Sequence, residues 1–188
     1  MKNSKYKEQW NNYFEGDIEI WSYFGYQYHS YLITKHIVPL LSIPKTGKLI
    51  QLGTGLGITV ELLCNLYGEH RTLGYDLFNP LYHPNIHFLD ITKEMPPASK
   101  IAYLEIDVGS MDHFEEKRMD ILLWALNNMV NNGYILTNRK LVSKLKIEGY
   151  NNFEIINLNE FDIPELWKNV HQSRLDTKTI LKVKNRDI

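Results

Sequence analysis

The stretch Lys48-Leu49-Ile50-Gln51-Leu52-Gly53-Thr54-Gly55-Leu56-Gly57 decides the fold of this chain. A run typical of a buried strand leads into glycines at every second position, and a helical pattern follows from Ile58. Because glycine has no Cβ, a ligand can approach such a loop closely, and open α/β sheets bind ligands at this end of their strands. We therefore expect a strand, a ligand-binding turn and a helix in direct succession, with a plain glycine turn as the structural alternative.

The spacing of these glycines argues against a dinucleotide site. A dinucleotide fingerprint places glycine at i, i+2 and i+5. Here the position five residues after Gly53 is Ile58. A nucleotide-dependent oxidoreductase is therefore disfavoured.

Strand-like and helical segments alternate through the rest of the chain. Further strands are predicted at residues 71–77, 85–91, 101–107, 134–137, 153–158 and 177–183, helices at 58–66, 119–130 and 139–147, and a turn at 131–133. Helices join the early strands, and a hairpin-like return joins the last two. This order predicts a doubly wound, mostly parallel seven-stranded α/β sheet with an antiparallel edge strand. We expect a single domain over residues 1–188, in which 1–46 form a helical, aromatic-rich cover and 47–188 form the core.

The composition is that of an ordinary globular protein, with 44% hydrophobic and 23% charged residues. A formal net charge of −1 offers no positive field for a phosphate backbone, so we expect no nucleic-acid partner. The N-terminus has no apolar signal segment, and the apolar runs are too short for a membrane span. The single cysteine, Cys64, is predicted to be a buried thiol in a helix. These features predict a cytoplasmic protein without a membrane partner that acts on a small molecule.

Two carboxylates follow the next strands at informative places. Asp76 ends the second strand, about twenty residues past the loop, where a carboxylate can accept hydrogen bonds from both hydroxyls of a ribose. Asp90 ends the third strand, and Ile91 follows it. Taken alone, Asp76 is as well explained by a cap or a solvated position, and Asp90 by a helix cap or a turn. The glycine loop shifts Asp76 toward the ligand-binding interpretation.

Together, the loop and Asp76 resemble motif I and its partner in the class I, Rossmann-like, S-adenosylmethionine-dependent methyltransferases. The resemblance implies that the loop wraps the amino-acid part of S-adenosylmethionine, and that an acidic residue at the third strand end lies near the adenine amino group. One position departs from the family, which usually carries Asp or Glu two residues before the first glycine, where this chain has Gln51. The residues implied to bind the cofactor are Gln51, Gly53, Thr54, Gly55, Gly57, Asp76, Leu77, Asp90 and Ile91.

Residues 119–136 are similar to macrolide-sugar O-methyltransferases and, more distantly, to catechol O-methyltransferases, which bind magnesium. Asp107 would match one of their metal ligands. The next acidic positions are replaced by Thr137-Asn138-Arg139, and an arginine there would oppose a cation. We therefore expect no metal.

Three residues are candidates for the chemistry of methyl transfer, which requires placement of the nucleophile and, for a hydroxyl, removal of its proton. Asp107, after the fourth strand, could orient a hydroxyl or amine, or could simply bond backbone amides. His113 could act as a base near neutral pH, or could be a surface residue. His29 lies in the aromatic N-terminal segment, whose rings either line an acceptor pocket or pack the helical layer onto the sheet.

The leading hypothesis is a methyltransferase that acts on an oxygen or nitrogen of a small molecule. A degenerate relative that binds an adenosyl ligand or a partner protein without turnover is the alternative. The oligomeric state stays open, with a homodimer among the possibilities.

Overall fold

The computed structural model describes residues 30–97, 100–107, 115–164 and 176–184. Within them, the helix over residues 30–37 and the short turn η1 (Val38–Leu40) precede the sheet. The strands are β1 (Lys48–Leu52), β2 (Thr72–Asp76), β3 (Ile86–Phe88), β4 (Ile101–Ile106), β5 (Met129–Asn138), β6 (Phe153–Ile156) and β7 (Lys178–Val183). The other helices are α3 (Ile58–Tyr67), α4 (Glu115–Asn128) and α5 (Arg139–Ile147), with the short turns η2 (Glu69–Arg71) and η4 (Leu158–Glu160).

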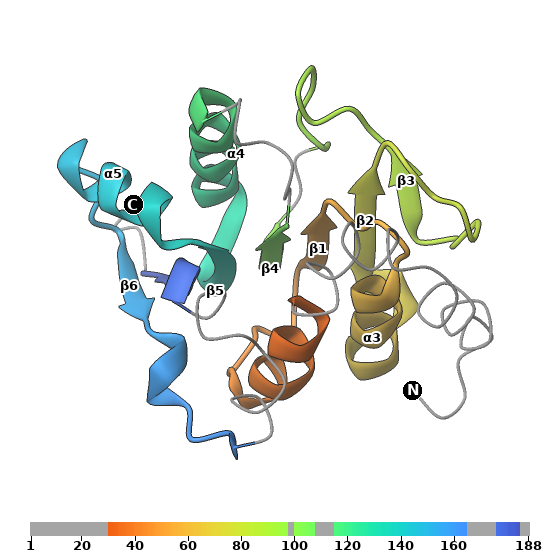
Figure 1. Cartoon of the computed structure of the whole chain (residues 1–188), viewed down its shortest axis with the longest axis horizontal. Coiled ribbons are helices and arrows are strands. Elements are labelled where there is room, and N and C mark those ends of the chain that lie inside the picture. The colour runs from red at the N-terminus through yellow and green to blue at the C-terminus, as the bar shows by residue number, and fades with distance from the viewer. Residues whose placement is uncertain (1–29, 98–99, 108–114, 165–175, 185–188) are drawn as a thin grey trace.

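The described strands form one seven-stranded sheet in the order β3-β2-β1-β4-β5-β7-β6 (Figure 1). The strands from β3 through β5 pair in parallel, and β7 pairs antiparallel with both β5 and β6. The predicted doubly wound sheet with antiparallel pairing at one edge is confirmed. The antiparallel strand itself, β7, lies one place in from the edge, because β6 adds to its outer side.

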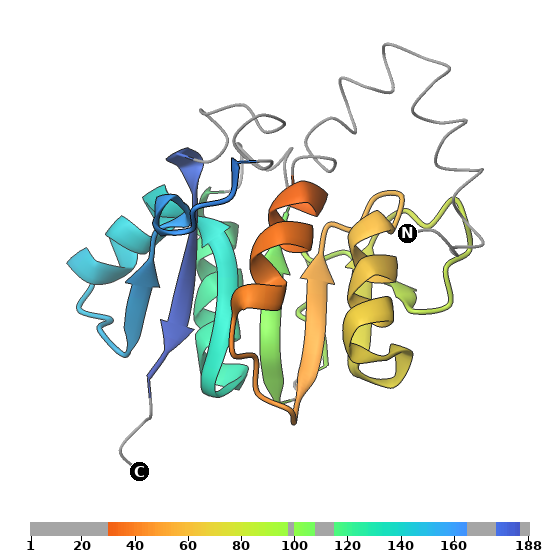
Figure 2. The same ribbon diagram turned by 90° about the horizontal axis from the view of Figure 1, so that it is seen from below.

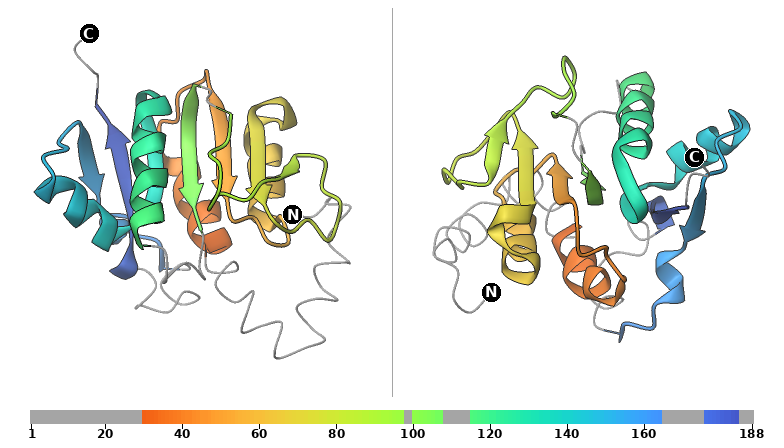
Figure 3. Two further views of the ribbon diagram at one scale, coloured as in Figure 1. Left: turned by 90° about the horizontal axis from the view of Figure 1, so that it is seen from above. Right: turned by 180° about the vertical axis from the view of Figure 1, so that it is seen from behind.

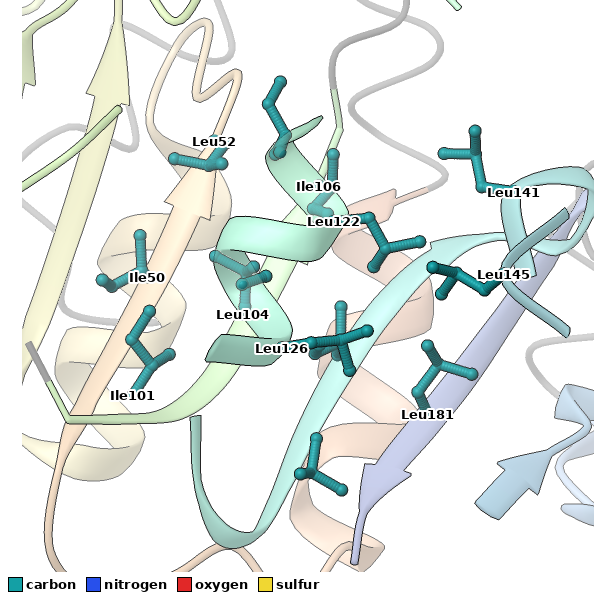
Figure 4. Packing of buried hydrophobic residues seen from close by; sticks show 14 of the residues in the cluster. Ile50, Leu52, Ile101, Leu104, Ile106, Leu122, Leu126, Leu141, Leu145 and Leu181 are labelled. Atoms are coloured by element: carbon teal, nitrogen blue, oxygen red, sulfur yellow. The ribbon is translucent and has the colours of Figure 1, made fainter. Parts of the chain in front are cut away.

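Helices cover both faces of the sheet. Helix 30–37 and α3 lie on one face, and α4 and α5 lie on the other (Figures 1 and 3). Successive side chains of a strand point to opposite faces, so Leu49 packs beneath helix 30–37, whereas Ile50 packs beneath α4. Figure 4 shows the α4 and α5 side, where leucines of both helices meet aliphatic side chains of β1, β4 and β7. Burial of these two apolar layers holds the strand ends in fixed positions.

Two predicted boundaries are wrong near β5. The expected turn at 131–133 lies inside this strand, and the helix expected to reach residue 130 ends at Asn128. Asn132 does adopt a positive φ of 61°. The strand nevertheless runs on through it, because Met129 pairs with Ile101 and a shift of register on β4 accommodates the irregularity. Local turn propensity is overridden here by pairing with a neighbouring strand.

The third strand is shorter than the predicted 85–91. Its pairing with β2 ends at Asp76 and Phe88, because β2 offers no further residues beyond Asp76.

None of the described helices has the length and apolar character needed to cross a membrane.

Candidate functional site

The glycine loop adopts a backbone conformation that residues with a Cβ rarely take. Gly53, Gly55 and Gly57 all have positive φ, between 49° and 80°. Gly57 is the N-cap of α3 with a φ of 77°, and a Cβ there would lie 2.6 Å from Cδ1 of Ile86. The Gly57 amide donates to the Thr54 carbonyl at 2.8 Å, which closes the loop. The predicted glycine turn is therefore present at the carboxyl end of β1, the upper end of that strand in Figure 2, and close approach of a ligand to it stays a prediction.

Asp76 contacts this loop directly. Its Oδ2 accepts a hydrogen bond of 2.7 Å from the Gly55 amide, 21 residues away in sequence, and its Oδ1 accepts one of 3.1 Å from the Phe78 amide. Each carboxylate oxygen keeps a further lone pair for another donor. Leu77 beside it is 55% exposed. The structure thus brings together the two features that the sequence singled out, with an apolar side chain free to cover a ligand.

The side chain of Asp90 stabilises a local turn. Its Oδ1 accepts hydrogen bonds from the Thr92 amide and hydroxyl, and its Oδ2 forms an ion pair of 2.9 Å with Lys93. The Thr92 hydroxyl, followed by Lys93, lowers the pKa of Asp90 to about 2. Ile91 is buried in the core beneath α4. The turn that we considered as an alternative is therefore present, and the predicted contacts of Asp90 and Ile91 with adenine stay predictions.

Asp107 follows β4 and is paired with a lysine from β7. Its Oδ1 lies 3.1 Å from Nζ of Lys178, and the two side chains are 7% and 18% exposed. The backbone amide of Asp107 donates to the Leu52 carbonyl at 2.9 Å. Among the described residues, its side chain therefore binds an ammonium group, and bonding to the backbone amides that follow it stays the alternative.

Glu105 is a site residue that our sequence analysis missed. It is fully buried on β4, where Oε2 accepts hydrogen bonds from the hydroxyls of Thr34, at 2.6 Å, and Tyr103, at 3.1 Å. Nε2 of Gln51 donates to Oε1 at 3.5 Å. Burial, reinforced by Asp107, raises the pKa of Glu105 to about 7. The sequence feature that could have revealed Glu105 is a carboxylate within the apolar run Ile101–Ile106, because glutamate is almost never fully buried unless it is paired.

Four buried polar atoms have no hydrogen-bond partner in the part of the chain that the structure describes. They are Gln51 Oε1, Thr54 Oγ1, Asp107 Oδ2 and Thr137 Oγ1. All four lie within the last two residues of β1, β4 or β5 or within two residues after the strand end. Leaving such a group unpaired costs about 1–3 kcal/mol. Their concentration at the carboxyl ends of adjacent strands makes this edge of the sheet the candidate ligand site.

The connection between β2 and β3 is held against α3 by a buried histidine. His83 is 3% exposed, and its Nε2 lies 3.0 Å from Oε2 of Glu61. Its Nδ1 accepts a hydrogen bond from the Asn85 amide at 3.2 Å. Since Nδ1 accepts, the proton of the neutral ring belongs on Nε2, facing Glu61. This pair fixes the segment that follows Asp76.

The remaining candidates are placed as follows. His29 and His113 lie outside the described residues. Asn138 caps α5 by accepting a hydrogen bond of 2.9 Å from the Lys140 amide.

Within the described ranges, no three His, Cys, Asp or Glu side chains gather as a metal site would require. The absence of a metal stays a prediction. Cys64 is buried as a free thiol, as predicted.

No family model matches the sequence, and no curated protein matches it. Solved structures do match the fold. A TehB-like SAM-dependent methyltransferase from Corynebacterium glutamicum is 15% identical, with a TM-score of 0.53 and 96% of each chain covered. A SAM-dependent methyltransferase from Archaeoglobus fulgidus is 14% identical, with a TM-score of 0.52, 96% of this chain and 100% of the other covered.

The plantazolicin methyltransferase BpumL, solved with a desmethyl plantazolicin analogue and SAH, is 13% identical, with a TM-score of 0.53 and 94% of each chain covered. The chain spans 63% and 64% of the length of the first two structures that it matches, from Clostridium acetobutylicum and Streptomyces venezuelae. The likenesses to the three structures with TM-scores of 0.52 and 0.53 confirm the Rossmann-like methyltransferase fold.

Proposed function

We propose that this chain is an S-adenosylmethionine-dependent methyltransferase that transfers a methyl group to an oxygen or nitrogen of a small molecule. The observation that carries the proposal is the hydrogen bond between the Gly55 amide and Asp76 Oδ2. It joins a glycine loop of suitable spacing to a carboxylate with spare lone pairs, and a ribose presents two hydroxyl donors to such a carboxylate. The unpartnered atoms Gln51 Oε1 and Thr54 Oγ1 beside the loop support occupation by a polar ligand.

The residues present fit the cofactor. Gly53, Gly55 and Gly57 would leave room for it, Asp76 would hold its ribose, and Leu77 would cover its base. When bound, S-adenosylmethionine supplies an activated methyl group on a sulfonium centre. The protein then has to hold the acceptor in line with that group.

Asp107 is the described residue best suited to orient the acceptor. Its buried Oδ2 lacks a partner among the residues that the structure describes, and its Oδ1 is fixed by Lys178. A carboxylate oxygen in this state accepts a hydrogen bond from the hydroxyl or amine that receives the methyl group. His113 and His29 stay the candidate bases from the sequence.

The class of acceptor is proposed from charge and from the fold. A net charge of −1 argues against a polyanion, and BpumL, which shares the fold, was solved with a pentazolic desmethylPZN analogue. We therefore propose a small-molecule acceptor and retain the sequence predictions of a cytoplasmic protein without nucleic-acid or membrane partners.

A protein that binds the adenosyl ligand without turnover is the second candidate. Gln51 carries no charge where the resembling family has an acid, and Lys178 already occupies one oxygen of Asp107. Binding of S-adenosylmethionine without release of S-adenosylhomocysteine over a broad acceptor panel would favour this candidate.

Calorimetric titration with S-adenosylhomocysteine tests the binding. We expect Asp76→Asn to weaken the affinity about tenfold or more, because hydrogen bonds to a charged group contribute roughly 1.5–3 kcal/mol. Asp120→Asn, which removes the same charge from an exposed position on α4, is the matched control and should bind like the wild type. Absence of binding at millimolar concentration would refute the proposed function.

A further inference from the structure

Glu105 lies on the face of β4 that helix 30–37 covers, together with Tyr103 and Asp107 at alternate positions. This face therefore carries two carboxylates. Lys178 is bonded to Asp107. Among the described residues, Glu105 has two hydroxyls and one amide as hydrogen-bond donors, and no ammonium or guanidinium group lies within hydrogen-bonding distance of it. When both carboxyl groups are ionised, the described part of this cluster thus has one negative charge more than it has cations.

The two oxygens of Glu105 are used unequally. Oε2 accepts from both Thr34, at 2.6 Å, and Tyr103, at 3.1 Å. Oε1 has only the contact of 3.5 Å from Nε2 of Gln51, which is at the limit of a hydrogen bond. A fully buried carboxylate is stable as an ion only when it is well bonded and paired. Oε1 is therefore open to a stronger donor.

Gln51 adds a second open acceptor at the same place. It is directly opposite Glu105 in the pairing of β1 with β4, so both side chains project from the same face. Its Oε1 is buried and has no partner within the described residues. The unmet atoms of this pair are both acceptors, and one belongs to a carboxylate. The pair is complementary to a donor with a positive charge.

The position of this pair relative to the loop identifies the donor. Gln51 is two residues before Gly53, and β1 lies between β2, which ends in Asp76, and β4. A ligand whose ribose is held at Asp76 and which crosses the glycine loop reaches the ends of β1 and β4 with its other part. In S-adenosylmethionine this part is an amino acid with an α-ammonium group.

Given the proposed function, we propose that Glu105 binds the α-ammonium group of the cofactor's methionyl part, with Gln51 Oε1 as a second acceptor. The carboxylate that Gln51 lacks is then supplied one strand away, at the same register. The departure at Gln51 is in this view a relocation of charge and not a loss of it.

The test compares two ligands that share the adenosyl group. S-adenosylhomocysteine has the amino-acid part, and 5′-methylthioadenosine lacks it. We expect Glu105→Gln to lower the affinity for S-adenosylhomocysteine at least tenfold. The affinity for 5′-methylthioadenosine should stay within twofold of the wild-type value. The exchanged variant Q51E/E105Q returns a carboxylate to the pair and should regain most of the lost affinity.

Thr34→Val is the matched control, because it removes a hydrogen-bond donor to Glu105 but keeps the carboxyl group. It should lower the affinity for S-adenosylhomocysteine far less than E105Q does. Equal weakening of both ligands in E105Q, or of neither, would overturn the inference but not the proposed function, provided that the wild type binds both ligands. A wild-type protein that binds neither ligand would overturn the proposed function itself, and this inference with it.

A measurement on the wild type alone keeps the inference testable if E105Q does not fold. Asp107, Lys178 and Tyr103 are the titratable groups that act on Glu105 from β4 and β7, and Thr34 faces it from helix 30–37. Binding an ammonium group favours the ionised carboxylate. We therefore expect proton release on titration with S-adenosylhomocysteine at pH 6.5, read from calorimetry in buffers of different ionisation enthalpy. Proton uptake or no exchange would contradict the inference.

Discussion

Gly74 in β2 is packed so closely that an added methyl group should disturb the glycine loop. A Cβ at this position would lie 2.6 Å from Cγ2 of Thr54, 2.8 Å from Cγ2 of Val60 and 3.1 Å from Cγ1 of Ile86. Favourable contacts between carbon atoms lie near 3.5–4.0 Å, so the first two contacts overlap by roughly 1 Å. The side chains of Thr54 and Val60 are β-branched, and neither can rotate away without leaving its preferred rotamer.

We therefore expect Gly74→Ala to push the loop and α3 away from β2. Overpacking of this kind costs about 1–3 kcal/mol, and the reduced freedom of the unfolded chain returns about 0.4–1 kcal/mol. The net loss of unfolding free energy should be about 1–2 kcal/mol, measured by urea denaturation. Affinity for S-adenosylhomocysteine should fall as well, since Thr54 belongs to the loop.

Gly149→Ala is the comparison variant. Gly149 has a φ of 88°, and a Cβ there would meet nothing within 4 Å. Its cost arises from backbone strain alone, about 1–2 kcal/mol, and it should leave ligand affinity unchanged. A G74A protein as stable as the wild type, with unaltered affinity, would refute the reasoning that β2 supports the loop through this contact.

Three further predictions concern buried charges. The pKa of Glu105 is raised from 4.5 to about 7, so the folded state keeps a proton that the unfolded chain has released between these values. Wild-type stability should therefore fall as the pH rises from about 4.5 through 7, by at most about 3 kcal/mol, and Glu105→Gln should flatten this slope in urea denaturation at several pH values. Lys178→Met should destabilise the fold by about 1–3 kcal/mol, because it leaves Asp107 partly buried without its cation; adding Asp107→Asn should recover part of the loss, and a loss that is simply additive would contradict the pairing. His83→Ala should lower the unfolding free energy by about 2–4 kcal/mol through a cavity and an unpaired Glu61, measured by thermal denaturation, and a change below about 0.5 kcal/mol would show that His83 does not hold the connection.

Local sequence patterns predicted much of the fold. The strand, glycine loop and α3 follow from alternation, glycine spacing and helical periodicity, all of which act over a few residues. The contact of the loop with Asp76 was also predictable, because the order strand, helix, strand places the ends of β1 and β2 side by side. The extent of β5 could not be predicted from local patterns, because it depends on pairing with β4.

The glycine loop, its spacing and the placement of Asp76 beside it were determined by the sequence itself, since each depends on short-range backbone preferences and on the handedness of one crossover. Only the tertiary structure decided that Glu105 faces Gln51, that Thr34 bonds Glu105 and that Lys178 holds Asp107. Thr34 and Lys178 are each 71 residues from their partners. Such contacts depend on the register of whole strands and on the insertion of β7 next to β5, which no local pattern encodes.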